Sequence, residues 1–179
     1  MWDMKAQKEV DQFSAHEGLV TALVVSSDGT NLLSAGSDAV AKVWSIENHD
    51  PLVTCDAHER AIRAATISPD GRVIATSSDD GRIVLWSAKT GLDRRTLPGA
   101  RTIVRSLNFS TDGKTLVTAG DDRALRVWDV ATLTQRQSLT AHTKAVRSLL
   151  FSHSAENELI SAGLDGAIKL WSPIKPEGE

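Results

Sequence analysis

The apolar positions of this chain recur in an alternation that predicts several copies of one antiparallel unit. Pairs of apolar residues two positions apart occur in four stretches, at Leu23 and Val25, Ala65 and Ile67, Leu107 and Phe109, and Leu149 and Phe151. Apolar residues at every second position line one face of a strand, so each unit is predicted to begin with a strand. In three units a turn written SSDG, SPDG or STDG follows and leads into a second apolar strand.

The tryptophans give the length of the unit. They stand at positions 2, 44, 86, 128 and 171, at intervals of 42, 42, 42 and 43 residues. A period of about 40 to 45 residues is typical of the four-stranded blades of a propeller. The one longer interval arises in the fourth unit, where the turn is the longer stretch SHSAENE.

Further residues keep a fixed spacing in every unit. An Ala-His step opens three units at His16, His58 and His142, and Gly99-Ala100 stands in its place in the third. A hydroxyl residue and an aspartate four positions apart follow in all units, and the tryptophan comes six positions after the aspartate. With Trp2-Asp3 and Trp128-Asp129 as literal dipeptides, the chain resembles the WD-repeat β-propellers over essentially its whole length. The resemblance implies an all-β fold, a β-propeller of four-stranded antiparallel blades with four blades in this chain.

The resemblance also implies a hydrogen-bonded tetrad inside each blade. A carboxylate inside a protein is costly unless its oxygens accept hydrogen bonds, and the histidine N–H supplies one of them. The implied structural residues are His16, Ser34, Asp38 and Trp44; His58, Thr76, Asp80 and Trp86; Thr118, Asp122 and Trp128; and His142, Ser161, Asp165 and Trp171.

The third tetrad lacks its histidine because Ala100 occupies that position. Asp122 is therefore expected to be short of a donor, and a missing hydrogen-bond partner of this kind costs about 1–3 kcal/mol. We expect the third blade to be the least stable one, unless Arg101 or water takes the place of the histidine.

Catalytic interpretations of the same residues are weaker. His, Ser and Asp are the residue types of a nucleophilic triad, but such a site needs one exposed, activated serine, whereas this set repeats blade by blade. Asp79-Asp80 and Asp121-Asp122 resemble acid/base or metal-binding pairs, yet turn and tetrad roles account for them. We expect no catalytic residue, no metal and no cofactor. Cys55 is expected to pack in an outer strand, with a reactive thiol as the alternative.

Partners of the family often dock at the mouth of the central channel, and the resemblance implies which residues face it. The position five residues after the histidine holds Thr21, Arg63, Arg105 and Arg147, and the position before the tetrad aspartate holds Ser37, Asp79, Asp121 and Leu164. The candidate partner-binding residues are Arg63, Arg105, Arg147, Thr21, Asp79 and Asp121.

Two interpretations of these residues remain open. Arg63 with Asp79, and Arg105 with Asp121, are exposed ion pairs worth under about 1 kcal/mol each and form no site. Alternatively, the arginines bind an acidic or phosphorylated peptide. Arg147 is the best candidate for that role, because its blade has Leu164 where the acid would be.

We expect a single domain over residues 1–179, either a propeller or half of one, with repeats at about 14–55, 56–97, 98–139 and 140–179. Outer strands are expected at 52–55, 94–97 and 136–139, but the proline-broken segment 173–179 makes a poor one. Residues 8–13 have the place of an outer strand before the first histidine and are expected to close the last blade.

Because blades of this family usually pack seven or eight to a ring, we expect two chains to exchange residues 8–13 and close an eight-bladed homodimer. A four-bladed ring within one chain, and a part excised from a longer propeller, are the alternatives.

Composition sets limits on the partners and the compartment. The formal net charge of −3, with basic residues spread along the chain, lacks the balance that nucleic-acid binding usually demands. No run of about 18 apolar residues is present to span a membrane, and a single cysteine can form no intrachain disulfide. We expect a cytoplasmic protein with no nucleic-acid or membrane partner.

The sequence favours a non-enzymatic scaffold that binds a protein or peptide at the channel mouth. A regulatory or sensory fragment of a larger polypeptide is the main alternative, and an enzyme is a weaker one. An enzyme needs one asymmetric cluster of reactive groups, and the repeats have none.

Overall fold

The computed structural model describes residues 2–9, 12–56, 58–98, 102–152 and 158–172, and its regular structure there consists of strands alone. The strands are β1 (Trp2–Asp3), β2 (Lys8–Glu9), β3 (Val20–Val25), β4 (Asn31–Gly36), β5 (Val40–Ser45), β6 (Pro51–Asp56), β7 (Ile62–Ile67), β8 (Val73–Ser78), β9 (Ile83–Ser87), β10 (Arg95–Thr96), β11 (Val104–Phe109), β12 (Thr115–Gly120), β13 (Ala124–Asp129), β14 (Gln135–Thr140), β15 (Val146–Phe151), β16 (Leu159–Gly163) and β17 (Ile168–Trp171).

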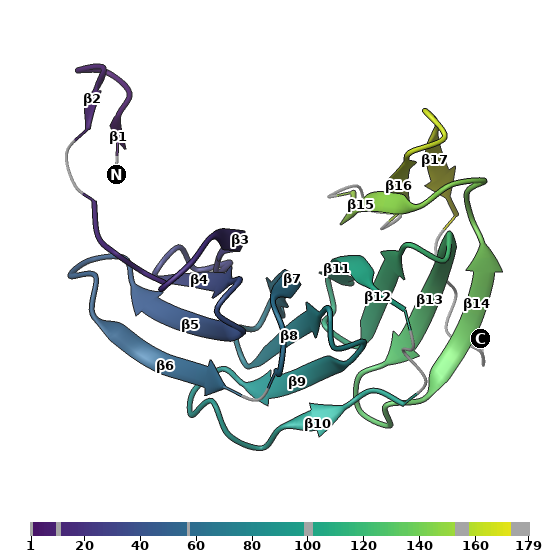
Figure 1. Ribbon diagram of the computed structural model, residues 1–179, viewed down its shortest axis with the longest axis horizontal. Coiled ribbons are helices and arrows are strands. Elements are labelled where there is room, and N and C mark those ends of the chain that lie inside the picture. The colour runs from purple at the N-terminus through teal and green to yellow at the C-terminus, as the bar shows by residue number, and fades with distance from the viewer. Residues whose placement is uncertain (1, 10–11, 57, 99–101, 153–157, 173–179) are drawn as a thin grey trace.

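The strands from β3 onward form four antiparallel sheets, called blades one to four, and each sheet keeps its strands in chain order; β1 and β2 form a separate two-stranded sheet. Blades one to three are β3 to β6, β7 to β10 and β11 to β14, and blade four has the three strands β15 to β17. The blades stand side by side along an arc, with β3, β7, β11 and β15 on its concave side (Figure 1). The all-β expectation is thus confirmed, and the described residues form an open arc rather than a four-bladed ring within one chain.

Short turns join the first two strands of blades one to three for a local reason. Gly29, Gly71 and Gly113 each have a φ near +70°, a left-handed conformation that glycine adopts without steric penalty. The serine that opens each turn donates to the aspartate two residues later, as in Ser68 Oγ to Asp70 Oδ1 at 2.6 Å. The predicted Asp-Gly turns are therefore present, and they set the register of the first hairpin.

The hydrophobic core lies between neighbouring blades. Leu33, Val43 and Cys55 of blade one pack with Ile62 and Trp86 of blade two in a single buried cluster. Equivalent clusters join blade two to blade three and blade three to blade four. Each blade is thus stabilised by the blades that adjoin it, which is the pattern of a repeat protein.

The outer faces of blade one and blade four have no such neighbour among the described residues. In blade one, Val20 and Leu23 are 51% and 63% exposed, whereas the equivalent residues of the other blades are at most 8% exposed. In blade four, Ile168 and Leu170 are 72% and 66% exposed, against at most 3% at their equivalents. We call these the two open faces. They are the faces by which neighbouring blades pack together elsewhere in this chain.

The N-terminal segment was expected to supply an outer strand, and within the single chain it does something else. Lys8–Glu9 pairs with Trp2–Asp3, so that Trp2 stands opposite Glu9. Trp44 and Pro51, and Trp128 and Gln135, pair at the same spacing in blades one and three. The hairpin therefore repeats the corner between a third and an outer strand. Residues 10 and 11, within the expected closing strand 8–13, lie outside the described residues.

Candidate functional site

Charged residues expected at the channel mouth form one line across blades two to four, here called the charged rim. It consists of Arg63, Asp79, Arg105, Asp121 and Arg147. The charges interact across blade boundaries: Arg105 of blade three lowers the pKa of Asp79 in blade two after the larger effect of Arg63, and Arg147 contributes to lowering the pKa of Asp121 after Arg105. The structure thus brings five of the six candidate binding residues together.

A repeated irregularity of the first strand positions the arginines. In each blade the register between the first two strands shifts by one residue, as between Val104 and Ser106 in blade three. The extra residue is the one five positions after the histidine column, and it is Arg63, Arg105 or Arg147 in the last three blades. A β-bulge bends its strand and redirects the side chain of the extra residue. The arginines therefore project from the paired strands near the start of the first strand, at the same end of the blade as Asp79 and Asp121.

Two of the arginines are engaged in two-point ion pairs. Arg63 donates through Nε to Asp79 Oδ1 at 2.7 Å and through Nη2 to Asp79 Oδ2. Arg105 donates in the same way to Asp121, at 2.9 and 2.7 Å. Hydrogen bonding from the arginine lowers the pKa of each aspartate and raises the pKa of its own guanidinium. These pairs leave Nη1 of each arginine with free N–H donors.

Arg147 differs from the other two because Leu164 stands where its acid would be. Arg147 is exposed, and no hydrogen bond or ion pair holds its side chain among the described residues. Leu164 beside it is also exposed, at 52%. The rim thus ends in an exposed arginine without a hydrogen-bond partner among the described residues.

The first blade does not continue the rim. The single hydroxyl hydrogen of Thr21 has two carbonyl acceptors within reach, Ala35 O at 3.0 Å and Ile62 O at 2.7 Å, and the shorter contact joins blade one to blade two. In the position of the aspartates, Ser37 Oγ accepts from the Leu19 N–H at 2.8 Å. Thr21, although a candidate binding residue, has its hydroxyl occupied by a bond between blades.

Inside the blades, the tetrad residues form continuous chains of hydrogen bonds. In blade two, Trp86 Nε1 lies 2.9 Å from Thr76 Oγ1, Thr76 Oγ1 lies 2.8 Å from His58 Nε2, and His58 Nδ1 lies 2.8 Å from Asp80 Oδ2. Blades one and four repeat the arrangement through His16 and His142. An indole N–H can only donate and a carboxylate can only accept, so the chain runs from tryptophan to hydroxyl to histidine to aspartate.

The hydroxyl, histidine and aspartate of each tetrad are ordered as in a Ser–His–Asp triad, but the hydroxyl is buried away from solvent. Ser34 is 1% exposed, Thr76 and Ser161 are 0% exposed, and each hydroxyl also accepts the tryptophan N–H. A nucleophile must reach a substrate, and the burial of these oxygens denies them that access. The arrangement fits structural links between loop and sheet rather than acyl transfer.

Blade three replaces the missing histidine in a way that was not foreseen. Trp128 Nε1 still donates to Thr118 Oγ1 at 3.0 Å, while Asp122 accepts from Arg126 Nη2 and from the Ala124 N–H at 3.3 Å. Asp122 therefore does not lack a donor. Ala100 and Arg101, on which the expectation rested, lie outside the described residues.

The replacement leads to a test of blade three. Changing Arg126 to methionine is expected to lower the free energy of unfolding by about 1–3 kcal/mol, since it leaves the Asp122 carboxylate without its charged partner. Adding Ala100→His to that variant should restore much of the loss, because the histidine then completes the tetrad. Urea unfolding of the single and double variants measures both effects. No recovery in the double variant would contradict the equivalence of the two donors.

Other reactive groups offer no site. Burial raises the pKa of the Cys55 thiol to about 12, so it stays protonated and packs as a small apolar residue. In the part of the chain that the structure describes, no group of three or more His, Cys, Asp or Glu residues is placed to hold a metal. Among the described residues, no helix is long and apolar enough to cross a membrane.

Two contributions to these sites were missed by sequence reasoning. The bulge that redirects the arginines leaves no mark in residue type, because it depends on pairing with the next strand. The role of Arg126 has a signal: Lys42, Arg126 and Lys169 share the position four residues after the tetrad aspartate. Lys42 and Lys169 donate to the Ala15 and Ala141 carbonyls, beside their histidines.

Comparison with known sequences gives the same repeats. The family model described as WD domain, G-beta repeat matches residues 7–45, 49–87, 91–129 and 133–172. Eukaryotic translation initiation factor 3 subunit I from Culex quinquefasciatus is similar to this chain, with 35% identity over 48 residues, which are 27% of this chain and 15% of that protein.

Among solved structures, the chain described as "Structure of U3-55K" is similar, with a TM-score of 0.80 and 27% sequence identity. The superposition covers 89% of this chain and 50% of that chain. The present chain therefore spans about half the length of that solved relative, and a smaller share of the initiation-factor subunit.

Proposed function

The chain belongs to the WD40 repeat family, and from that membership we propose that it is a non-enzymatic scaffold that binds a partner protein on its charged rim. The observation that carries the proposal is the unpaired guanidinium of Arg147 at the end of a line of paired charges. The family repeats suggest protein interaction in general, and the rim adds a chemical preference to it.

The preferred ligand group is a carboxylate or phosphate on a peptide. Arg147 has its planar fork free for a two-point contact with such a group. Arg105 lies in the same position of the neighbouring blade and keeps Nη1 free of Asp121, so it can add a further donor. No Trp or Tyr belongs to the rim, and without aromatic anchors we expect modest affinity.

The experiment is a peptide screen with a variant of Arg147. Fluorescein-labelled peptides that carry phosphoserine, glutamate or glutamine at one central position are measured by fluorescence anisotropy. We expect acidic peptides to bind, and Arg147→Ala to weaken that binding about tenfold, equivalent to about 1.4 kcal/mol. The proposal would be contradicted by peptides whose binding is unchanged in Arg147→Ala, or that bind equally well with glutamate and with glutamine at the central position.

Leu164→Asp provides a second variant. It restores the aspartate that the equivalent positions of blades two and three possess, as Asp79 and Asp121. Arg147 should then form an internal pair like that of Arg105, and the added carboxylate should also repel an acidic ligand, so that peptide binding is lost. Arg136→Ala, on the outer strand of blade three, is the control that should leave peptide binding unchanged.

As part of the proposed function, a second copy of the chain completes the ring. The open faces of blades one and four are the two surfaces that pack together at every internal blade boundary. Their exposed aliphatic residues favour burial, and one chain cannot bring them together across its own arc (Figure 1). Two copies that pair head to tail close an eight-bladed ring in which every blade has two neighbours.

Phe13 supports this proposal because of where it already lies. Its ring packs against Trp44 of blade one, with centroids 5.0 Å apart, and against His49 at 5.2 Å. In blade two, Leu97, which directly follows the outer strand β10, packs in the same cluster as Trp128 of the next blade. Phe13 holds the corresponding place before blade one, and from this we infer that the segment 8–13 supplies the outer strand of a preceding blade. We also propose that the protein lies in the cytoplasm, because a chain with a single cysteine forms no intrachain disulfide and suits a reducing compartment.

A further inference from the structure

Apart from the charged rim, a groove lies at the opposite end of blades one and two. Two adjoining openings of about 450 and 730 Å³ share Arg72 and Ser87 in their walls. Both are lined by the turns between the first and second strands and between the third and outer strands. The antiparallel pairing of β7 and β8 places these turns at the opposite end of the blade from Asp79. We call the two openings together the outer groove.

The groove exists because the outer strand of blade two is cut short. Trp44 pairs with Pro51 and Trp128 with Gln135 at the start of the outer strands of blades one and three. The corresponding residue in blade two is Asp93, whose φ of +55° is left-handed, and β10 is limited to Arg95–Thr96. The chain therefore leaves the edge of β9 beside Trp86 and opens the groove there.

The walls of the outer groove carry an excess of positive charge. Four cations line it, Arg72, Lys89, Arg94 and Arg95, against the single carboxylate of Asp93. Among the described residues no ion pair engages Lys89, Arg94 or Arg95, and Arg72 reaches Asp70 only at 3.9 Å with both side chains mostly exposed. This excess stands out in a chain whose net charge is −3. Such a local field attracts anionic segments.

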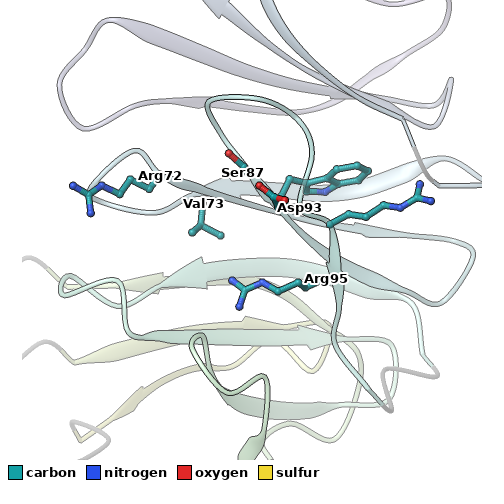
Figure 2. A pocket seen from close by; sticks show the side chains of 7 residues that line it. Arg72, Val73, Ser87, Asp93 and Arg95 are labelled. Carbon is teal, nitrogen blue, oxygen red and sulfur yellow. The ribbon is translucent and has the colours of Figure 1, made fainter.

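The floor between the cations is apolar. Figure 2 shows Val73 between Arg72 and Arg95, with Asp93 and Ser87 on the side toward the third-strand turn. Val43, Leu52 and Val53 of blade one continue the floor into the larger opening. A ligand here meets aliphatic side chains below and guanidinium groups at the sides.

We propose that the outer groove binds an extended acidic peptide segment of a partner protein. An extended peptide places alternate side chains on opposite sides, so that carboxylates can meet Arg72 and Arg95 while apolar side chains meet Val73 and the exposed Leu52. A protein segment fits better than single-stranded RNA, because bases need an aromatic face to stack on and Trp86 is only 3% exposed. This surface is separate from the charged rim and serves a second contact.

Binding of a defined acidic peptide tests the proposal. The probe is a fluorescein-labelled short peptide of alternating Glu and Leu, with an alternating Lys and Leu peptide as its charge-reversed counterpart. We expect only the acidic peptide to bind, and Arg72→Glu and Arg95→Glu each to weaken binding at least about tenfold. Lys114→Glu reverses the charge at the equivalent of Arg72 in blade three and should leave the affinity within about twofold.

A gain-of-affinity variant guards against folding defects. Asp93→Asn removes the one carboxylate in the groove and keeps a residue type that tolerates left-handed φ, so binding should tighten about threefold. The groove variants are also measured in an Arg147→Ala background, where binding at the rim is weakened, and the effects of Arg72→Glu and Arg95→Glu should persist there, which separates the groove from the rim. The proposal is overturned if Lys114→Glu matches the loss in Arg72→Glu, if Asp93→Asn does not tighten binding, or if an oligouridylate displaces the peptide at equal concentration.

Discussion

Replacement of His58 with alanine is expected to lower the free energy of unfolding by about 3 kcal/mol, the largest effect of any single change in the tetrads. The reason is the burial of its partner: the Asp80 side chain is 4% exposed, whereas those of Asp38 and Asp165 are 13% and 10% exposed. Alanine leaves that carboxylate without the imidazole N–H, and it also removes the acceptor of the Thr76 hydroxyl. Urea unfolding followed by tryptophan fluorescence measures the loss.

His16→Ala is the matched comparison. It breaks the same two bonds around the more exposed Asp38 in a blade with one open face, so its effect should be smaller than that of His58→Ala. An equal or greater loss in His16→Ala would contradict the link between burial and tetrad strength.

The pH dependence has a defined sign. Burial by itself would raise the pKa of Asp80, but the Arg82 N–H, the His58 ring and the Glu59 N–H outweigh it and lower the pKa. A carboxylate with a lowered folded pKa contributes stability above its usual value of about 4 and loses it as the pH falls through the lowered value. The gap between wild type and His58→Ala should therefore narrow in acid.

Spacing predicted the repeated units and their length, and the resemblance to WD-repeat propellers implied the tetrad contacts inside them. Both depend on local chemistry: Asp-Gly turns, alternating apolar residues, and a hydroxyl and a histidine at fixed distances from a tryptophan. Each repeat states the pattern again, so a departure such as Ala100 is visible against the others. The pairs Arg63–Asp79 and Arg105–Asp121 were also foreseen as one of two interpretations, since both residues occupy fixed columns.

What could not be predicted depends on backbone geometry and on contacts that no pattern repeats. The outer groove arises from left-handed φ at Asp93, a residue that also favours ordinary turns, so its identity does not mark the site. The pairing of Lys8–Glu9 with Trp2–Asp3 was hidden because the same residues also fit an outer strand of another blade. Competition between two valid partners for one strand is a tertiary property, and the sequence pattern is equally compatible with either.

The second large expected effect concerns the mass of the protein in solution, which depends on whether a second copy of the chain closes the ring. The chain is expected to have about twice its single-chain mass of 19.3 kDa at micromolar concentration, and Ile168→Glu with Leu170→Glu should return it to a monomer. Fully burying aliphatic side chains of this size contributes about 1.5–3 kcal/mol each, and both residues are more than half exposed on the open face of blade four. Charges placed there oppose the packing. Light scattering coupled to gel filtration measures the mass.

Two further variants distinguish ring closure from non-specific association. Leu92→Glu changes a leucine that is 68% exposed on the turn between β9 and β10, away from both open faces, and should leave the dimer intact. Deletion of residues 1–6 removes β1, the competing partner of Lys8–Glu9, and frees that strand for β17 of the second copy. The truncated chain should therefore dimerise more tightly. A wild-type mass of one chain, or a dimer that survives both glutamates on β17, would exclude closure through these faces.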